Sequence, residues 1–282
     1  MFKPSKTKDI ESDAAPVSVA KKQRGIQSVE VGGRLLEALA HHRLPLALSE
    51  LASAAQLSAA QAHTYLVSLT RLGLVKRDAL TGSYEPGPLS LRLGLRHIEQ
   101  QPAYQAAVPH AASLAEIVGF SVAVCVAGAQ GPTIVRYERG SFPLHINLHI
   151  GTVMALETTS TGRVFCAFFD SQRIAVMLQN QQRTSERATV DGAGSAAEPV
   201  FGARLRAQLK EIRERGMERG IDAPSPGVSS LSVPVFDAQH RMQLALTVIG
   251  PSGSIDVDWD GPVALALRDT AQRVAAALDQ RS

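Results

Sequence analysis

The segment LETTSTGR, residues 156–163, gathers groups that could bind a small anion. Four hydroxyl residues, Thr158 to Thr161, run directly into Gly162, where a helical pattern begins. The first amides of a helix have no partner within it and lie at the positive end of its dipole, so together with flexible hydroxyls they suit a carboxylate. Ordinary helix capping is the alternative, and it accounts for one or two hydroxyls but not four. The segment predicts an anion site that includes Ser160, Thr161 and Gly162.

A second candidate surface is a predicted helix without acidic residues. The sequence holds no Asp or Glu between Glu50 and Asp78. Residues 58–71, placed on a helix that Ser58 would cap, form an apolar stripe that would pack inward and a polar stripe that a partner would meet. A helix in the DNA major groove must keep carboxylates away from phosphates, and it needs short donors and acceptors for the base edges. A solvated helix in an ordinary three-helix domain is the alternative. The polar stripe consists of Gln61, Thr64, Ser68 and Arg71.

Three further residues are placed to contact the DNA backbone. Lys76 and Arg77 follow the acid-free helix in a short predicted strand, and Ser49 is the expected N-cap of the preceding helix. Cations attract phosphates, and the N-terminus of a helix offers free amides to them. With the polar stripe, these residues predict double-stranded DNA as a partner.

Other reactive side chains give weaker signals. His145 and His149 lie in PLHINLHIG, residues 143–151, whose alternation predicts a strand. Four residues along a strand span about 13 Å, too far for one metal ion to bridge. Cys125 and Cys166 lie in the apolar surroundings typical of buried thiols. Sequence motifs of nucleotide-binding proteins, zinc proteases and serine hydrolases are absent. We therefore expect no catalytic residue, no metal and no cofactor.

Composition narrows the class of protein. The 282 residues are 45% hydrophobic and 20% charged, which is typical of a globular protein with one or two domains. No apolar run approaches ~18 residues, the start lacks the pattern of a signal peptide, and there are two cysteines, so we expect a cytoplasmic protein with no membrane partner. Residues 1–100 carry 13 Lys or Arg against 9 Asp or Glu, and the remainder carries 16 against 17. This asymmetry suits an N-terminal polyanion-binding domain.

The periodicity predicts four segments. Residues 1–24 are polar and end in KKQR, which is typical of a disordered basic arm. Residues 25–87 predict three helices and a hairpin, the plan of a winged helix-turn-helix. Residues 88–101 predict a linker helix. Residues 102–282 mix helices with antiparallel strands and predict an α+β domain, in which residues 181–198 are expected to form a long loop.

Several motifs resemble those of the IclR family of bacterial transcription regulators, in the family's order over roughly residues 26–280. They are LSELA, LSAAQAHTYLVSLTRLGLVKRD, TGSYEPG, HIGTVMALETTSTGRVFCAFF and GVSSLSVPVFD. The resemblance implies an N-terminal winged helix-turn-helix, a linker helix and a C-terminal effector-binding and oligomerisation domain of GAF-like α+β fold. It also implies homodimers or homotetramers, palindromic operator DNA and a small-molecule effector, such as an organic acid or an aromatic catabolite.

The resemblance also implies where the effector would bind. Family pocket positions match Ser160, Thr161, Ser230 and Thr247 of this sequence. Two further candidates are Ser232, which shares a strand face with Ser230, and Asp222, for which a plain loop residue is the alternative. The sequence departs from the family's pattern in two places, because Ile249 replaces a common pocket serine and Glu157 a common histidine.

The predicted DNA-binding helix departs from the family's pattern as well. SAAQ, residues 58–61, stands where the family usually has a proline and basic or Ser/Thr residues, and Thr64 stands where the family usually has a basic residue. The helix is therefore poor in cations. His63 matches a common family histidine, for which helix packing is the alternative role. The complete predicted DNA-binding set is Ser49, Ser58, Gln61, His63, Thr64, Tyr65, Ser68, Arg71, Lys76 and Arg77.

Three functions compete at this point. A DNA-binding transcription regulator controlled by a small-molecule effector accounts for both candidate sites, with effector binding changing the spacing of two recognition helices in a dimer. An enzyme with an appended DNA-binding domain would need a catalytic arrangement that the motifs do not supply. A winged-helix protein-interaction or sensor module is the third reading, which the cation-poor helix leaves open.

Overall fold

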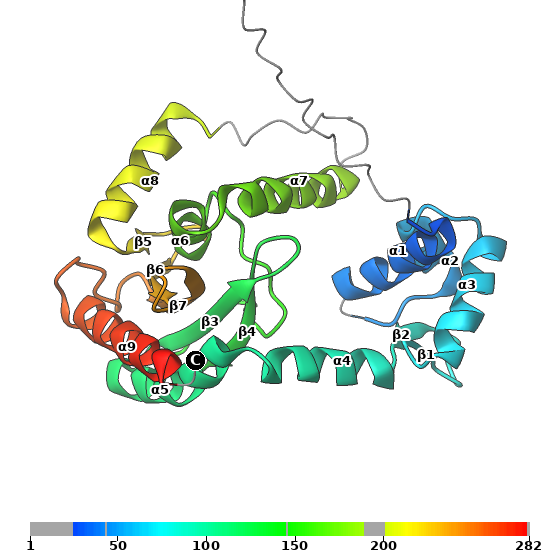
Figure 1. The fold of residues 1–282 in the computed structure, drawn as a ribbon, viewed down its shortest axis with the longest axis horizontal. Helices are drawn as coiled ribbons and strands as arrows, with labels where there is room; N and C mark the ends of the chain where they lie inside the picture. Colours follow the sequence, from blue (N-terminus) through cyan, green and yellow to red (C-terminus); the bar gives the residue numbers. More distant parts are fainter. Residues whose placement is uncertain (1–24, 43, 145, 189–200, 281–282) are drawn as a thin grey trace, which may run out of the picture. The chain divides into compact units, whose positions relative to one another are not determined.

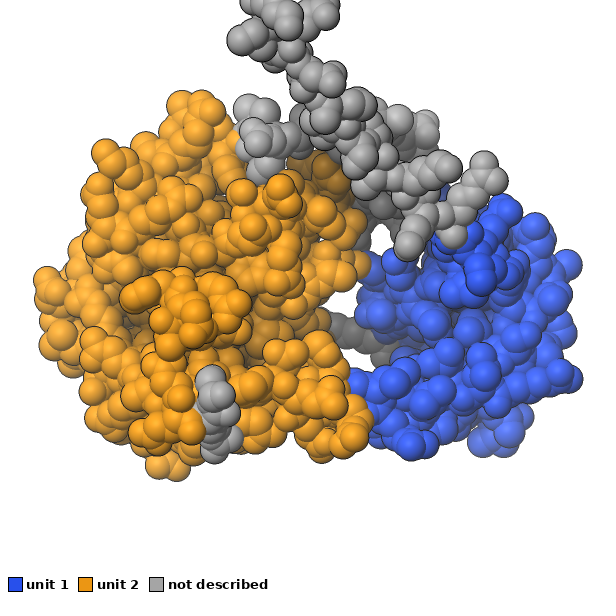
Figure 2. Space-filling view, viewed as in Figure 1, with its two compact units in different colours: residues 1–94 blue, residues 95–282 orange. Residues whose placement is uncertain are grey.

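The computed structural model describes residues 25–42, 44–144, 146–188 and 201–280. The chain forms two compact units, residues 1–94 and 95–282, which Figure 2 colours separately. Each has its own hydrophobic core. The predicted basic arm, residues 1–24, lies outside the described residues.

The first unit is built from helices and one hairpin, as predicted for a winged helix-turn-helix. Leu35, Leu51 and Leu66, one from each of the first three helices, are fully buried at its centre. The hairpin is antiparallel and pairs Lys76 with Glu85. The elements are α1 (Gln27–His41), α2 (Leu48–Ala54), α3 (Ala59–Arg71), β1 (Val75–Arg77), β2 (Tyr84–Pro86) and α4 (Pro88–Glu99), within which the unit boundary falls.

The start of α3 is fixed by a capping box. Ser58 Oγ accepts a hydrogen bond from the Gln61 N–H at 3.2 Å, and Gln61 Oε1 accepts from the Ser58 N–H at 3.1 Å. The predicted N-cap at Ser58 is therefore confirmed. The predicted N-cap at Ser49 is wrong, because α2 already begins at Leu48 and the Ala47 N–H donates to the Glu50 carboxylate at 2.8 Å.

The second unit has three layers around a five-stranded sheet (Figure 1). The strand order is β4-β3-β7-β6-β5, and all neighbours are antiparallel. Two helices, α5 and α9, cover one face, and α6 packs on the other with α7 and α8 beside it. The elements are α5 (Pro102–Val118), β3 (Ser121–Ala127), β4 (Pro132–Glu138), α6 (Ser160–Phe168), α7 (Ser171–Ala188), α8 (Ala203–Arg215), β5 (Glu218–Gly220), β6 (Val228–Phe236), β7 (Met242–Pro251) and α9 (Pro262–Asp279).

Alternation along β6 and β7 separates an apolar face from a hydroxyl-bearing face. Leu231 and Val233 pack in the core with α5 and α9. Ser230 and Ser232 face the opposite side, because successive strand residues point to opposite faces. Ser232 pairs with Thr247 on β7. The strands thus present their hydroxyls on the face that carries α6, where α6 packs on both strands.

Two sequence predictions of secondary structure fail here. The described residues of the predicted strand 143–151 form no strand. Its alternation arises because Leu144, Ile146 and Leu148 pack partly buried against the core next to α6. The loop predicted for residues 181–198 is wrong for residues 181–188, since α7 continues to Ala188. Among the described residues, we find no helix that is both long and apolar enough to cross a membrane.

Candidate functional site

A cavity of about 610 Å³ lies in the second unit, at the N-terminus of α6. It is bounded by strands β6 and β7 and by loop residues from 143–154 and 223–227. Aliphatic and thioether side chains, including Ile146, Leu148, Met154 and Ile249, line most of it. None of the described residues that line it carries a charge. Its polar groups are mainly hydroxyls, at Thr159, Ser160, Thr161, Ser225, Ser230 and Thr247.

Four of the predicted effector-binding residues line this cavity and contact one another in pairs. The Oγ atoms of Ser160 and Ser230 lie 2.8 Å apart, and the Oγ1 atoms of Thr161 and Thr247 also lie 2.8 Å apart. These partners are 70 and 86 residues apart in the sequence. The fold therefore brings the two hydroxyl clusters of the sequence to one place.

The hydroxyl pairs differ in what they can offer a ligand. Thr247 donates its single hydroxyl hydrogen to Ser232 Oγ at 2.9 Å, so Thr161 must be the donor to Thr247. Thr161 then has only lone pairs left. In the Ser160–Ser230 pair one hydroxyl is the donor, and the hydrogen of the other remains for a ligand. This pair is the better donor to a carboxylate.

Three predicted effector-binding residues do not line the cavity. The Gly162 N–H donates to Thr159 Oγ1 at 2.9 Å, and a Cβ at position 162 would lie 2.0 Å from the Ala155 carbonyl oxygen. Gly162 thus permits close packing beneath the site. Ser232 is fully buried and accepts from Thr247. Gly162 and Ser232 therefore have no atoms that line the cavity.

Asp222, the third, holds the loop that forms one wall of the cavity. Its Oδ1 accepts from the Ser252 hydroxyl at 2.6 Å and from the Gly227 N–H at 2.9 Å. These two hydrogen bonds lower the pKa of the Asp222 carboxyl below its ordinary value. Asp222 adopts φ +49°, and the loop 223–227 that follows it lines the cavity. Asp222 therefore supports the wall rather than contacting the space itself.

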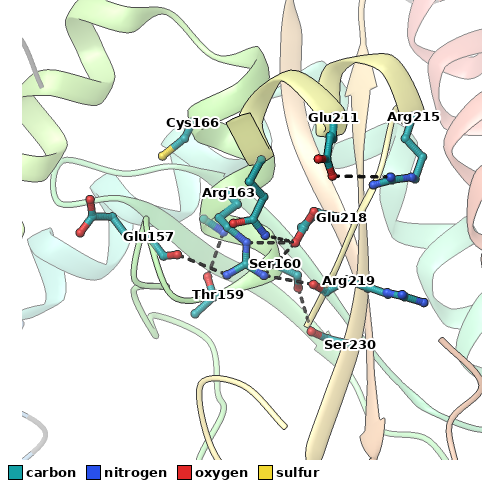
Figure 3. Close-up of polar contacts among 12 residues, drawn as sticks. Glu157, Thr159, Ser160, Arg163, Cys166, Glu211, Arg215, Glu218, Arg219 and Ser230 are labelled. Atoms are coloured by element: carbon teal, nitrogen blue, oxygen red, sulfur yellow. Dashed lines mark hydrogen bonds and ion pairs between the residues drawn. The ribbon is translucent and has the colours of Figure 1, made fainter. Parts of the chain in front are cut away.

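A buried ion pair beside the cavity was missed by sequence reasoning. Arg163 Nη2 lies 2.9 Å from Glu218 Oε1, and the two side chains are almost completely buried (Figure 3). Burial raises the pKa of the Glu218 carboxyl, against the opposing effect of Arg163. The signal available in the sequence was a cation followed by the apolar run VFCAFF, since a buried charge needs a partner. The partner is 55 residues away and could not be identified from spacing.

The thiols and histidines carry no reactive arrangement among the described residues. Burial raises the pKa of Cys125 and of Cys166 to about 12, so both thiols stay protonated near neutral pH. His145 lies outside the described residues, and the ring of His149 hydrogen-bonds to the Thr152 hydroxyl. Within the described part of the chain, no group of three or more His, Cys, Asp or Glu side chains could hold a metal ion.

The predicted DNA-binding stripe lies on the surface of the first unit. Nine of the ten predicted residues are exposed, and Tyr65 is the exception, because it packs partly buried against the core. Thr64 donates its hydroxyl to the Ala60 carbonyl at 3.1 Å, so its oxygen is left as an acceptor. The exposed residues are Ser49, Ser58, Gln61, His63, Thr64, Ser68, Arg71, Lys76 and Arg77.

Two cations of this surface are held along the hairpin. Lys76 Nζ lies 2.8 Å from Glu85 Oε1 on the paired strand. Arg77 Nε donates to the Gly82 carbonyl at 3.1 Å, and its guanidinium lies 5.6 Å from the centre of the Tyr84 ring. Glu85 offsets part of the positive charge of the hairpin. Arg71, at the end of α3, is exposed on the same unit.

Comparison with known proteins shows similarity over most of the chain. Residues 28–79 match the IclR helix-turn-helix domain, and residues 96–276 match the bacterial transcriptional regulator IclR C-terminal domain. The DNA-binding transcriptional repressor YiaJ of Escherichia coli K12 is 24% identical over 255 residues, covering 89% of this chain and 87% of YiaJ. Both units of the chain are therefore matched.

Solved structures give the same result. The crystal structure of Pseudomonas aeruginosa HmgR is 31% identical, with a TM-score of 0.53, and the match covers 90% of this chain and 98% of HmgR. An IclR homologue from Microbacterium hydrocarbonoxydans, complexed with 4-hydroxybenzoate, has a TM-score of 0.69 at 17% identity, covering 90% and 100% of the two chains.

The winged helix-turn-helix, the α+β unit and these matches define a DNA-binding transcription regulator with a ligand-binding C-terminal domain. The matched domains together span most of the 282 residues. The chain belongs to the IclR family of bacterial transcription regulators. The family resemblance and the fold class predicted from the sequence are thereby confirmed.

Proposed function

We propose that the cavity at the N-terminus of α6 binds the effector of this regulator, an organic acid with an apolar body. The observation that carries the proposal is the meeting of Ser160, Thr161, Ser230 and Thr247 on one cavity wall. A carboxylate would accept from the Ser160–Ser230 pair and from the Ser160 and Thr161 amides at the start of α6. The apolar remainder would lie against side chains such as Met154 and Ile249. The complex of the Microbacterium homologue with 4-hydroxybenzoate supports this class of ligand.

The uncharged lining limits the ligand further. A second carboxylate would be moved from water to a place where no described lining residue offers a cation, and an unpaired buried charge is costly. We therefore propose that the ligand is a monocarboxylate, such as an aromatic acid. Ser232, Gly162 and Asp222 act by supporting the residues that touch the ligand.

The DNA-binding role of individual residues is also a proposal. In it, Gln61, His63, Thr64 and Ser68 face base edges, while the remaining exposed residues of the predicted set contact the backbone. Residues 25–87 form the DNA-binding domain, 88–101 the linker helix and 102–282 the effector-binding and oligomerisation domain, with residues 1–24 as a basic arm. A homodimer or homotetramer binds a palindromic operator in the cytoplasm, and the protein catalyses no reaction.

One experiment separates the two proposed sites. Thermal shift against a panel of small mono- and dicarboxylates identifies the ligand, and a gel shift on the DNA upstream of the gene measures operator binding. In the variant S230L, a bulky apolar side chain takes the place of a cavity hydroxyl, so the response to the ligand should be lost while operator binding persists. Loss of both would show that Ser230 is structural. If operator binding does not weaken with added salt, phosphate contact is not its basis.

A further inference from the structure

Arg163 lies on the same first turns of α6 as the cavity hydroxyls, and its guanidinium extends toward Glu218 and Arg219 (Figure 3). Its side chain is buried, with 8% of the residue exposed, and is absent from the cavity lining. Its guanidinium donates to two segments, the strand β5 and the residues that precede α6. Nε donates to Glu218 Oε1 at 3.0 Å, Nη1 to the Glu157 carbonyl at 3.2 Å and Nη2 to the Arg219 carbonyl at 3.0 Å.

The strand that Arg163 binds leads into a loop that lines the cavity. Glu218 and Arg219 belong to β5, and the loop 223–227 that follows lines the cavity. The last residue of β5, Gly220, pairs with Ser230. A Cβ at position 220 would lie 3.0 Å from Ser230 Oγ and 3.9 Å from Ser160 Cβ. The end of β5 therefore lies against the hydroxyl pair proposed to bind the carboxylate.

Glu218 and Arg219 also contact residues outside α6 and β5. Gln208 of α8 donates to the same Glu218 oxygen at 2.9 Å. Arg219 stacks over Trp259, the one tryptophan of the chain, with its guanidinium 4.3 Å from the ring centre. Any shift of β5 relative to α6 must stretch bonds that this buried guanidinium makes on both sides.

We propose that Arg163 is a positioning residue that holds the first turn of α6 and the strand β5 in fixed register, and so fixes the position of loop 223–227, the cavity wall that follows β5. The inference deepens the proposed ligand site and rests on it for its functional meaning. A planar guanidinium with five N–H donors can bind a carboxylate and two carbonyls at once, whereas a lysine ammonium offers a single point charge on a flexible stem. Charge alone is therefore not sufficient at this position.

The test is hydrogen exchange of the full chain without any ligand. In the variant R163K, amides of residues 162–166 in α6 and 217–222 around β5 should exchange about tenfold faster, which corresponds to a loss of about 1.4 kcal/mol in the local opening free energy. Amides of β7 and α9 should be unchanged. The control is R241K, because the Arg241 guanidinium is exposed and pairs with Asp237 in the turn between β6 and β7. R241K should leave both segments unchanged.

A second variant keeps the result independent of a general loss of stability. E218Q retains an oxygen that can accept from Arg163 and Gln208 but removes the charge, so it should accelerate the same two segments by a smaller factor. Unchanged exchange in either segment of R163K overturns the proposal, as does an increase spread over the whole second unit. Because no ligand is added, failure of every tested carboxylate to bind would refute the proposed effector and leave this measurement standing.

Discussion

Replacing Gly162 by alanine should destabilise the second unit and deform the cavity wall. A Cβ at this position would lie 2.0 Å from the Ala155 carbonyl oxygen, 2.6 Å from Leu156 Cα and 2.6 Å from the Leu156 carbonyl oxygen. All three are backbone atoms, so no flexible side chain can move aside. Residues 155–156 or the start of α6 must shift, and the neighbouring Met154 and Thr159 line the cavity.

The expected change in the free energy of unfolding of G162A is the sum of opposing effects. Alanine improves helix propensity over glycine by about 1 kcal/mol. Overpacking of a close contact costs about 1–3 kcal/mol, and disturbing the hydrogen bond from the Gly162 N–H to the Thr159 cap costs about 1 kcal/mol more. The net expectation is a loss of about 1–3 kcal/mol in the free energy of unfolding. For a unit of this size that lowers Tm by about 2–4 °C per kcal/mol.

The assay is thermal unfolding of G162A, followed by titration with the carboxylate that stabilises the wild type. The matched control is G253A in the same unit, because a Cβ there would meet no atom within 4 Å, and its Tm should change little. G162A should also bind the carboxylate at least about tenfold more weakly, since a 1.4 kcal/mol loss of ligand contacts has that effect. A Tm for G162A at or above the wild-type value would refute the reasoning that this close approach fixes the cavity wall.

Three more outcomes are expected. S68E adds a carboxylate to the proposed DNA face and should weaken operator binding about tenfold or more, whereas the uncharged S68Q should not. Equal affinities of S68E and the wild type in fluorescence anisotropy would place Ser68 outside the DNA interface. R71Q should lower the slope of log affinity against log salt by about 1, and an unchanged slope would remove Arg71 from the interface. At pH 8 the thiols of Cys125 and Cys166, with pKa values of about 12, should react with a thiol reagent only when the protein unfolds, and rapid labelling of the native protein would contradict their burial.

Local signals explain what the sequence predicted well. The cap at Ser58, the helix up to Arg71 and the hairpin after it depend on residues a few positions apart, so these elements can be predicted from short stretches of sequence. The hydroxyl run from Thr158 to Thr161 signalled a helix start for the same reason. Family resemblance, not periodicity, linked that run to Ser230 and Thr247.

The features that the sequence did not predict depend mostly on contacts between distant segments. Apolar residues alternate in 143–151 because one side of this segment packs against the core. A segment buried on one side has the same alternating pattern whether or not it pairs with a neighbouring strand. Glu218 lies in a three-residue strand that is too short to show a pattern, so neither β5 nor the ion pair with Arg163 was predicted. Ser49 was misplaced because a carboxylate, Glu50, took over the capping of α2.

The capping box of α3 restricts what Gln61 can read in a nucleobase. Its side-chain oxygen already accepts from the N–H and the hydroxyl of Ser58, each at 3.1 Å, so both lone pairs are occupied and only the NH₂ group remains. The two-point contact by which glutamine selects adenine requires that oxygen. Freeing it would break the Gln61 half of the capping box and leave the Ser58 N–H without its acceptor, although Ser58 Oγ would still cap the Gln61 N–H. A base opposite Gln61 should therefore expose acceptors alone in the major groove, as guanine does through N7 and O6.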